Sequence, residues 1–196
     1  MKAFLIGLGV IILGLAILIL PNINNVPKLD EDVKATWSQV QNQYKRRADL
    51  IPNLISTVKG YAKHEKSTFK EVTEARAKVG KLSLTPEMLS NPQLFQQFQN
   101  AQNTLSSALS RLMLVVERYP DLKASKNFLA LQTQLEGTEN RISVARRDYI
   151  QTVKLYNTEL RTYPGRIIAI IFYPEAQIKE TFEARDKEQE TPKVNF

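Results

Sequence analysis

The chain has 196 residues, with 27 Lys and Arg against 20 Asp and Glu, a formal net charge of +7, one His and no Cys. The absence of Cys excludes a disulfide framework, a thiolate metal cluster and a cysteine nucleophile, and one His cannot build a His-rich metal centre. This length fits one domain, with or without an anchor.

An uncharged apolar run, AFLIGLGVIILGLAILIL, covers residues 3–20. As a helix it would span about 27 Å, close to the ~30 Å hydrocarbon core of a bilayer. The alternative is a cleaved signal peptide, but the run exceeds the usual ~7–15 apolar residues, and no small-residue cleavage site follows it. We predict a retained transmembrane anchor over residues 1–20, which contacts the lipid bilayer through residues 3–20, and a linker over 21–28. Positive charges balance on the two flanks, so the side of the membrane stays open.

Beyond residue 29, apolar residues recur at spacings of three and four, which predicts amphipathic helices. The first stripe runs from Val33 to Val79 and contains Pro52. Proline has no amide hydrogen to donate to the Ala48 carbonyl, but the stripe resumes in phase after it. We therefore expect one kinked helix here, or two nearly collinear helices.

Asn91 and Pro92 have the residue types of a helix cap and a first helical position, and a heptad-like stripe starts at Leu94. The next helix is expected over about residues 122–163, and the short connection between the two requires an antiparallel reversal. The predicted fold is all-α: an N-terminal transmembrane helix followed by an elongated antiparallel three- to four-helix bundle with long, partly kinked helices. The bundle is expected over residues 29–178, followed by a charged C-terminal tail over 179–196.

Several charged residues flank the predicted seams of the later helices. Glu136 and Glu139 share a helix face, but the Glu-x-x-His spacing of carboxylate metal bundles is missing, and His64 lacks a second His four residues away. A metal-binding or enzymatic bundle that uses Glu139 and His64 is the alternative hypothesis. We predict instead no catalytic, metal-binding or cofactor-binding residues and no enzymatic activity. The candidates for a structural polar network are Glu117, Arg118, Glu136, Glu139 and Arg141.

The densest positive cluster is Lys45, Arg46 and Arg47. Such runs are commonly solvated helix faces, which is the interpretation we favour over a basic surface for nucleic acid or lipid. Aromatic residues are not interleaved with the cluster as a base-stacking surface requires, so no nucleic-acid partner is expected.

Two segments are candidates for interactions with other molecules. One is an uncharged amide face, because burying it removes no charge from water. The other is the apolar segment 166–173, RIIAIIFY, which is too short to span a membrane and would contact lipid or a partner, or cap the open end of the bundle. The candidate residues are Gln96, Gln99 and Asn103 on the amide face, and Ile167, Ile168 and Ile171 in the apolar segment.

Seven stretches together resemble the bacterial LemA family, over about residues 26–196. They are RADLIPNL at 47–54, VKGYAKHE at 58–65, EARA at 74–77, LSRLMLVVERYPDLKA at 109–124, LEGTENRISVARRDY at 135–149, YN at 156–157 and PKVNF at the C-terminus.

The resemblance implies a single-pass protein of the bacterial cytoplasmic (inner) membrane with a helical bundle and no catalytic residues. We expect a membrane-anchored scaffold or adaptor that forms a homo-oligomer or binds a membrane-protein partner.

Overall fold

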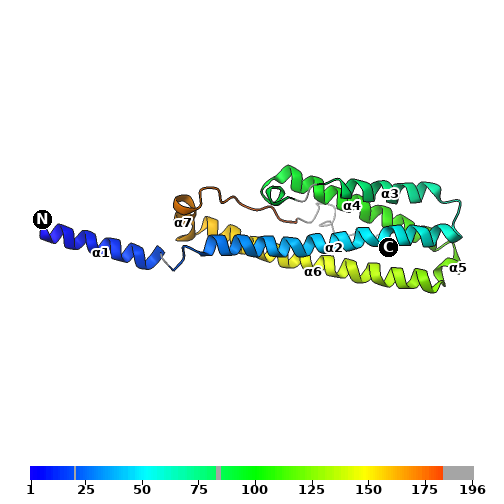
Figure 1. Cartoon of the computed structure of the whole chain (residues 1–196), viewed down its shortest axis with the longest axis horizontal. Coiled ribbons are helices and arrows are strands. Elements are labelled where there is room, and N and C mark those ends of the chain that lie inside the picture. The colour runs from blue at the N-terminus through cyan, green and yellow to red at the C-terminus, as the bar shows by residue number, and fades with distance from the viewer. Residues whose placement is uncertain (20, 83–84, 183–196) are drawn as a thin grey trace, which may run out of the picture.

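The computed structural model describes residues 1–19, 21–82 and 85–182. Helices are the only regular elements in these ranges, which confirms the all-α class (Figure 1). None of the helices there combines the length and apolar character needed to cross a membrane. Leu20, the last residue of the predicted anchor, lies outside the described residues. The elements are α1 (Lys2–Ile19), α2 (Asn25–Tyr61), α3 (Lys66–Gly80), the 3-10 helix η1 (Pro86–Ser90), α4 (Pro92–Val116), α5 (Pro120–Lys123), α6 (Lys126–Arg161) and α7 (Gly165–Phe172).

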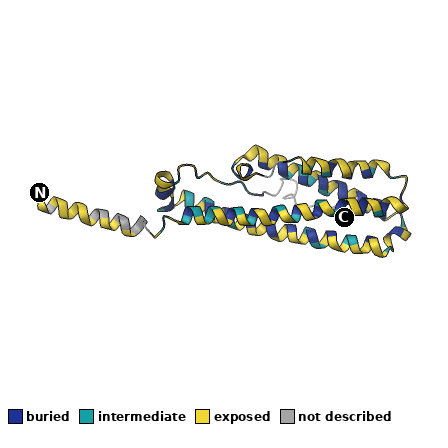
Figure 2. Cartoon of the chain, in the orientation of Figure 1, coloured by how far each residue is buried: buried dark blue, intermediate teal, exposed yellow. Residues whose placement is uncertain are grey.

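The long helices α2, α3, α4 and α6 run alternately up and down and form an elongated bundle, with α1 beyond one end (Figure 1). Helix α2 packs along α6, and α3 packs along α4. At one end α5 contacts α2, α4 and α6, and at the opposite end α7 contacts α2 and α6. Buried positions line the inner faces of these helices (Figure 2).

The expectation of a kinked or nearly collinear helix from Val33 to Val79 is wrong. The chain reverses at residues 62–65, and α3 lies against α4 instead of extending α2 (Figure 1). Ala62 is fully buried in the turn, and Phe69 and Val72 of α3 belong to one core cluster with residues of α2. Because the connection is four residues long, the apolar residues before and after it keep the spacing of one continuous helix. The stripe alone therefore does not distinguish a continued helix from a reversal.

Helix α2 continues through Pro52, as the resumed stripe predicts. The carbonyl of Ala48, which Pro52 leaves without an amide donor, accepts a hydrogen bond from Arg76 Nε of α3 at 2.8 Å. A side chain from the neighbouring helix therefore satisfies the backbone group that proline exposes.

The start of α4 agrees with the sequence prediction. Asn91 is the N-cap, and its Oδ1 accepts from the amides of Gln93 and Leu94, both at 3.1 Å. The buried seam begins one residue later than predicted, since Leu94 is 43% exposed whereas Phe95 is 1% exposed. The long helix expected over 122–163 is divided into short α5 and long α6.

An aromatic cluster fills the core between α2, α4 and α6. Trp37 of α2 lies at its centre, with ring centroids 5.2–6.3 Å from those of its four aromatic neighbours. Those neighbours are Phe95, Phe98, Tyr149 and Phe182.

Phe182 reaches this cluster because residues 173–182, here called the C-terminal strap, return along the bundle. The Asn157 side chain brackets the backbone of Lys179, donating to its carbonyl and accepting from its amide, both at 2.9 Å. Glu180 N donates to the Leu89 carbonyl at 2.6 Å. The predicted tail boundary at residue 179 falls inside this strap, and residues 183–196 lie outside the described residues.

Candidate functional site

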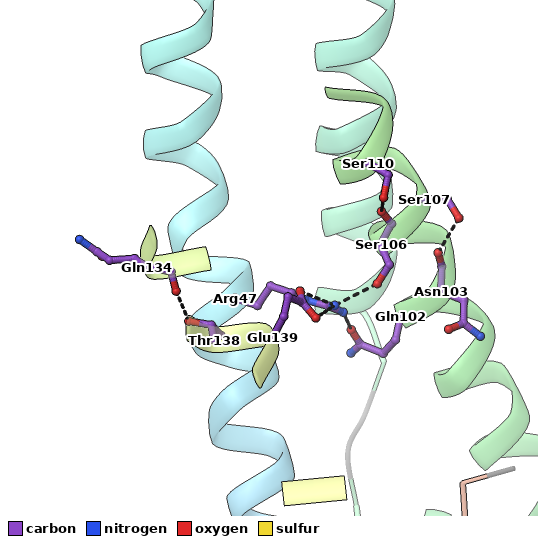
Figure 3. A network of polar contacts seen from close by, with 9 residues as sticks. All are labelled: Arg47, Gln102, Asn103, Ser106, Ser107, Ser110, Gln134, Thr138 and Glu139. Atoms are coloured by element: carbon purple, nitrogen blue, oxygen red, sulfur yellow. Dashed lines mark hydrogen bonds and ion pairs between the residues drawn. The ribbon is translucent and has the colours of Figure 1, made fainter. Parts of the chain in front are cut away.

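Arg47 extends from α2 into the space between α4 and α6 (Figure 3). It is 2% exposed, although the Lys45–Arg47 cluster to which it belongs is predicted from the sequence to be a solvated face. That assignment holds for Lys45 and Arg46, which are exposed, and is wrong for Arg47. Arg47 follows the buried Tyr44 by three residues and precedes the buried Ile51 by four, so it occupies a core position of α2.

The guanidinium of Arg47 contacts two other helices. Nη1 donates to Ser106 Oγ at 3.0 Å and to the Glu139 carboxylate at 3.0 and 3.3 Å. Nη2 donates to Gln102 Oε1 at 2.5 Å. The guanidinium carbon also lies 5.0 Å from the ring centroid of Tyr44. These contacts join α2, α4 and α6 (Figure 3). Arg47, Gln102, Ser106 and Glu139 together are called the polar layer.

Each of these three helices contributes one polar residue to its own buried seam. Gln102 is 4% exposed and lies between Phe98 and Leu105, at spacings of four and three. Thr138 is fully buried on α6, and its hydroxyl donates to the Gln134 carbonyl at 2.7 Å within the same helix. Polar residues at core positions of helical bundles fix the alignment of helices, because a shift would separate them from their partners.

The electrostatics of the layer depend on Glu139. Arg47 carries a positive charge, and a buried charge requires a partner. Glu139 is that partner, and its side chain is 44% exposed, so the carboxylate keeps part of its hydration. Arg47 Nε and Gln102 Nε2 are buried without a hydrogen-bond partner in the described part of the chain.

The other predicted network residues form separate surface contacts. Glu117 pairs with Lys123 at 2.5 Å, Arg118 pairs with Glu65 at 3.0 Å, and Glu136 accepts from Gln132 at 2.9 Å. Arg141 lines a shallow groove of about 440 Å³ together with Gln43 and Asp148. Of the five candidates, only Glu139 belongs to the polar layer.

Glu139 and His64 do not approach one another. His64 is exposed in the turn after α2, and about 21 Å of helix separates Arg47, the partner of Glu139, from Tyr61 at the end of α2. Over residues 1–19, 21–82 and 85–182, no group of three or more His, Asp or Glu side chains gathers as metal ligands would.

The interaction candidates lie on two separate surfaces. Gln96 is exposed, whereas Gln99 and Asn103 are half-buried on α4. In the apolar segment, which forms α7, Ile168 is fully buried against the bundle, and Ile167 and Ile171 are 43% and 61% exposed.

The buried tyrosines remain uncharged at neutral pH. Burial raises the pKa of Tyr44, although the nearby charges of Arg146 and Arg47 oppose the rise. Burial also raises the pKa of Tyr149, with a further contribution from Glu180, and raises the pKa of Tyr156 to about 12. The Tyr149 hydroxyl accordingly donates to the Glu180 carbonyl at 2.8 Å and holds the strap.

The fold and the site together define the class of protein: an elongated helical bundle whose helices are joined by a buried polar layer. The model of the LemA family matches residues 36–196, a range that contains the whole polar layer, and the chain belongs to this family. This confirms the resemblance inferred from the sequence motifs.

Three curated bacterial proteins are similar to the chain. Magnetosome protein MamQ 2 of Paramagnetospirillum magneticum is 28% identical over 166 residues, covering 76% of this chain and 60% of the relative. Protein LemA of Metamycoplasma hominis is 24% identical over 146 residues, covering 74% and 63%. Magnetosome protein MamQ of Magnetospirillum gryphiswaldense is 25% identical over 157 residues, covering 72% and 58%. The chain thus spans about three fifths of these relatives, and neither their names nor the family description indicates catalysis.

The burial of Arg47 and Gln102 as polar core residues was not predicted from the sequence. The signal that could have found Arg47 is the seven-residue gap between Tyr44 and Ile51 in the apolar stripe, with a charged residue at the position that continues the spacing. Gln102 has no such signal, because Ala101 lies three residues after Phe98 and four before Leu105 and continues the stripe.

Proposed function

We propose that the chain is a single-pass scaffold or adaptor anchored in a bacterial cytoplasmic membrane, and that its bundle associates with further copies or with a membrane-protein partner. The observation that carries this proposal is an elongated, rod-like bundle attached through a short linker to an uncharged apolar segment. Helix α6 alone is 36 residues long, or about 54 Å. A rod of this kind suits a role in which position and packing matter more than chemistry.

The membrane anchor is supported by the uncharged residues 3–20 and by the surroundings of α1. Helix α1 lies beyond the end of the bundle, and those of its apolar side chains whose burial the structure describes are exposed (Figure 2). Phe4, Val10 and Ile17 are 74%, 65% and 67% exposed. An apolar helix without a polar face is stable when lipid or protein surrounds it, not in water.

Self-association is supported by the surface of α4. Gln96 and Gln99 lie on a face without charges, where a second molecule can pack at no cost in charge desolvation. The Gln96 amide already donates along the helix to Asn100 Oδ1 at 3.3 Å. We assign this amide face to contact between copies.

The experiment is a mass measurement of the full chain in detergent over a range of concentrations, combined with crosslinking in membranes. We expect a mass above that of the monomer for the native chain and a monomer for the Gln96→Arg, Gln99→Arg double variant. Gln134→Arg together with Thr133→Arg adds the same charges to exposed positions of α6 and serves as the control. A native chain that stays monomeric and retains no partner on crosslinking contradicts the proposal.

A further inference from the structure

Helix α7 is held against the end of the bundle at which α2 begins. Asn25 in the first turn of α2 donates to Glu159 near the end of α6, with Nδ2 and Oε1 3.4 Å apart. Gly165 allows the chain to turn closely over α6, because a Cβ at this position would collide with the Glu159 backbone carbonyl. Ile168 and Ala169 then pack inward, at 0% and 8% exposed. The position of α7 is therefore fixed by the bundle.

The opposite face of α7 is apolar and uncovered. Ile170 and Ile171 are 66% and 61% exposed, Ile167 and Phe172 are 43% and 46% exposed, and Tyr163 just before the helix is 70% exposed. A helix that is apolar on all sides is normally buried in protein or lipid. Contiguous exposed apolar surface on a folded domain marks a contact with another apolar phase.

The same end of the bundle is tethered to the proposed anchor. Residues 21–24 connect the apolar run to α2, and a fully extended chain of four residues reaches at most about 14 Å. Helix α7 lies beside this junction (Figure 1). A bilayer that holds the anchor is thus always close to α7, whereas a second copy must arrive by diffusion.

We propose that the uncovered face of α7, formed by Tyr163, Ile167, Ile170, Ile171 and Phe172, inserts into the interface of the bilayer that holds the anchor. The inference rests on the proposed anchor. Short apolar helices bury one face about 5–10 Å into the boundary between headgroups and acyl chains. The exposed Arg161 and Arg166 flank this face and are suited to lipid phosphates. Two attachment points, the anchor and α7, would hold the long bundle at a fixed tilt to the membrane surface.

The test uses single-cysteine variants, which are unambiguous because the native chain has no Cys. Ile171→Cys, Leu114→Cys and Val10→Cys are made separately in the full chain and spin-labelled. Each is reconstituted into vesicles of phosphatidylethanolamine and phosphatidylglycerol. Collision of the label with oxygen, which partitions into lipid, is compared with collision with a water-soluble nickel chelate. Leu114 is the matched control, since it is 69% exposed on α4 at the opposite end of the bundle.

We expect the ratio of oxygen to nickel accessibility to be several-fold higher at position 171 than at position 114. A ratio at 171 equal to that at 114 overturns the inference. Low accessibility to both reagents at 171 also overturns it, because a protein surface would then cover α7. The label at position 10 separates the two proposals: a lipid-like ratio there with a water-like ratio at 171 leaves the anchor standing and removes only the role of α7.

Discussion

Arg76 Nε of α3 donates to the Ala48 carbonyl of α2 over 2.8 Å, in the turn of helix from which Pro52 removes the backbone donor. A proline in a helix interior normally costs about 3 kcal/mol, in part because a carbonyl loses its hydrogen bond. Arg76 restores that bond from outside the helix and joins α3 to α2. The two residues belong to different sequence motifs, RADLIPNL and EARA, which the fold brings together.

The first prediction is that the effect of Arg76→Met depends on Pro52. In the native background it leaves the Ala48 carbonyl without its partner and should lower the free energy of unfolding by about 1–3 kcal/mol. In a Pro52→Ala background the new amide serves Ala48, so the loss should shrink. Chemical unfolding of the full chain in detergent, followed by the fluorescence of the buried Trp37, measures both. Equal losses in the two backgrounds would show that Arg76 acts through another contact.

The second prediction concerns the polar layer around Arg47. Glu139→Ala leaves the buried guanidinium without its carboxylate and should cost about 1–3 kcal/mol, a range reduced from that of fully buried pairs because Glu139 is half exposed. The double variant Arg47→Met, Gln102→Leu removes the buried guanidinium and the buried amide from the layer and should cost less than Glu139→Ala, or stabilise the bundle. Unfolding in detergent measures both free energies.

The double variant Arg47→Met, Gln102→Leu should also lose the fixed alignment of its helices. Without the contacts of Arg47 that enforce register, its amide NMR signals should broaden or double, whereas those of the native chain should not. Sharp, single signals from the double variant would contradict a role of the layer in fixing register.

The third prediction compares two glycines. Gly165→Ala places a methyl group against the Glu159 carbonyl and should displace α7, lowering the thermal midpoint in detergent. Gly60→Ala, an exposed position in α2 with open space around its Cβ, should instead raise stability by about 0.5–1 kcal/mol. A neutral Gly165→Ala would mean that the turn before α7 adjusts without cost.

The fourth prediction concerns acid. Burial opposes ionisation of Asp30, but hydrogen bonds and charges from Lys34 and Lys179 outweigh it and lower the pKa of this carboxyl below its usual range. Its stabilising effect is therefore complete above the unfolded-state pKa of about 3.9 and is lost as the pH falls through the lower, folded-state pKa.

Lys179 Nζ lies 3.2 Å from Asp30, so this ion pair ties the strap to α2. Between pH 5 and pH 2 the native chain should lose more stability than Lys179→Met, because the pKa of Asp30 is lowered less in that variant. Unfolding curves at a series of pH values, compared between the two proteins, give the difference. Parallel pH profiles would exclude the ion pair as the source.

The sequence by itself determined the helical class, the Asn91 cap, the continuation of α2 through Pro52 and the family. These properties depend on residues close together in the chain, so spacing and cap chemistry suffice to predict them. Glu139 could also be predicted from the sequence as a member of a polar network, because it flanks the apolar seam of α6.

The tertiary structure alone decided the reversal after Tyr61, the burial of Arg47 and the return of Phe182 to the core. Helical spacing says which residues share a face but not which face meets which. A guanidinium becomes a core group only when Gln102 and Glu139 arrive from two other helices to receive it, and that depends on how the helices are assembled.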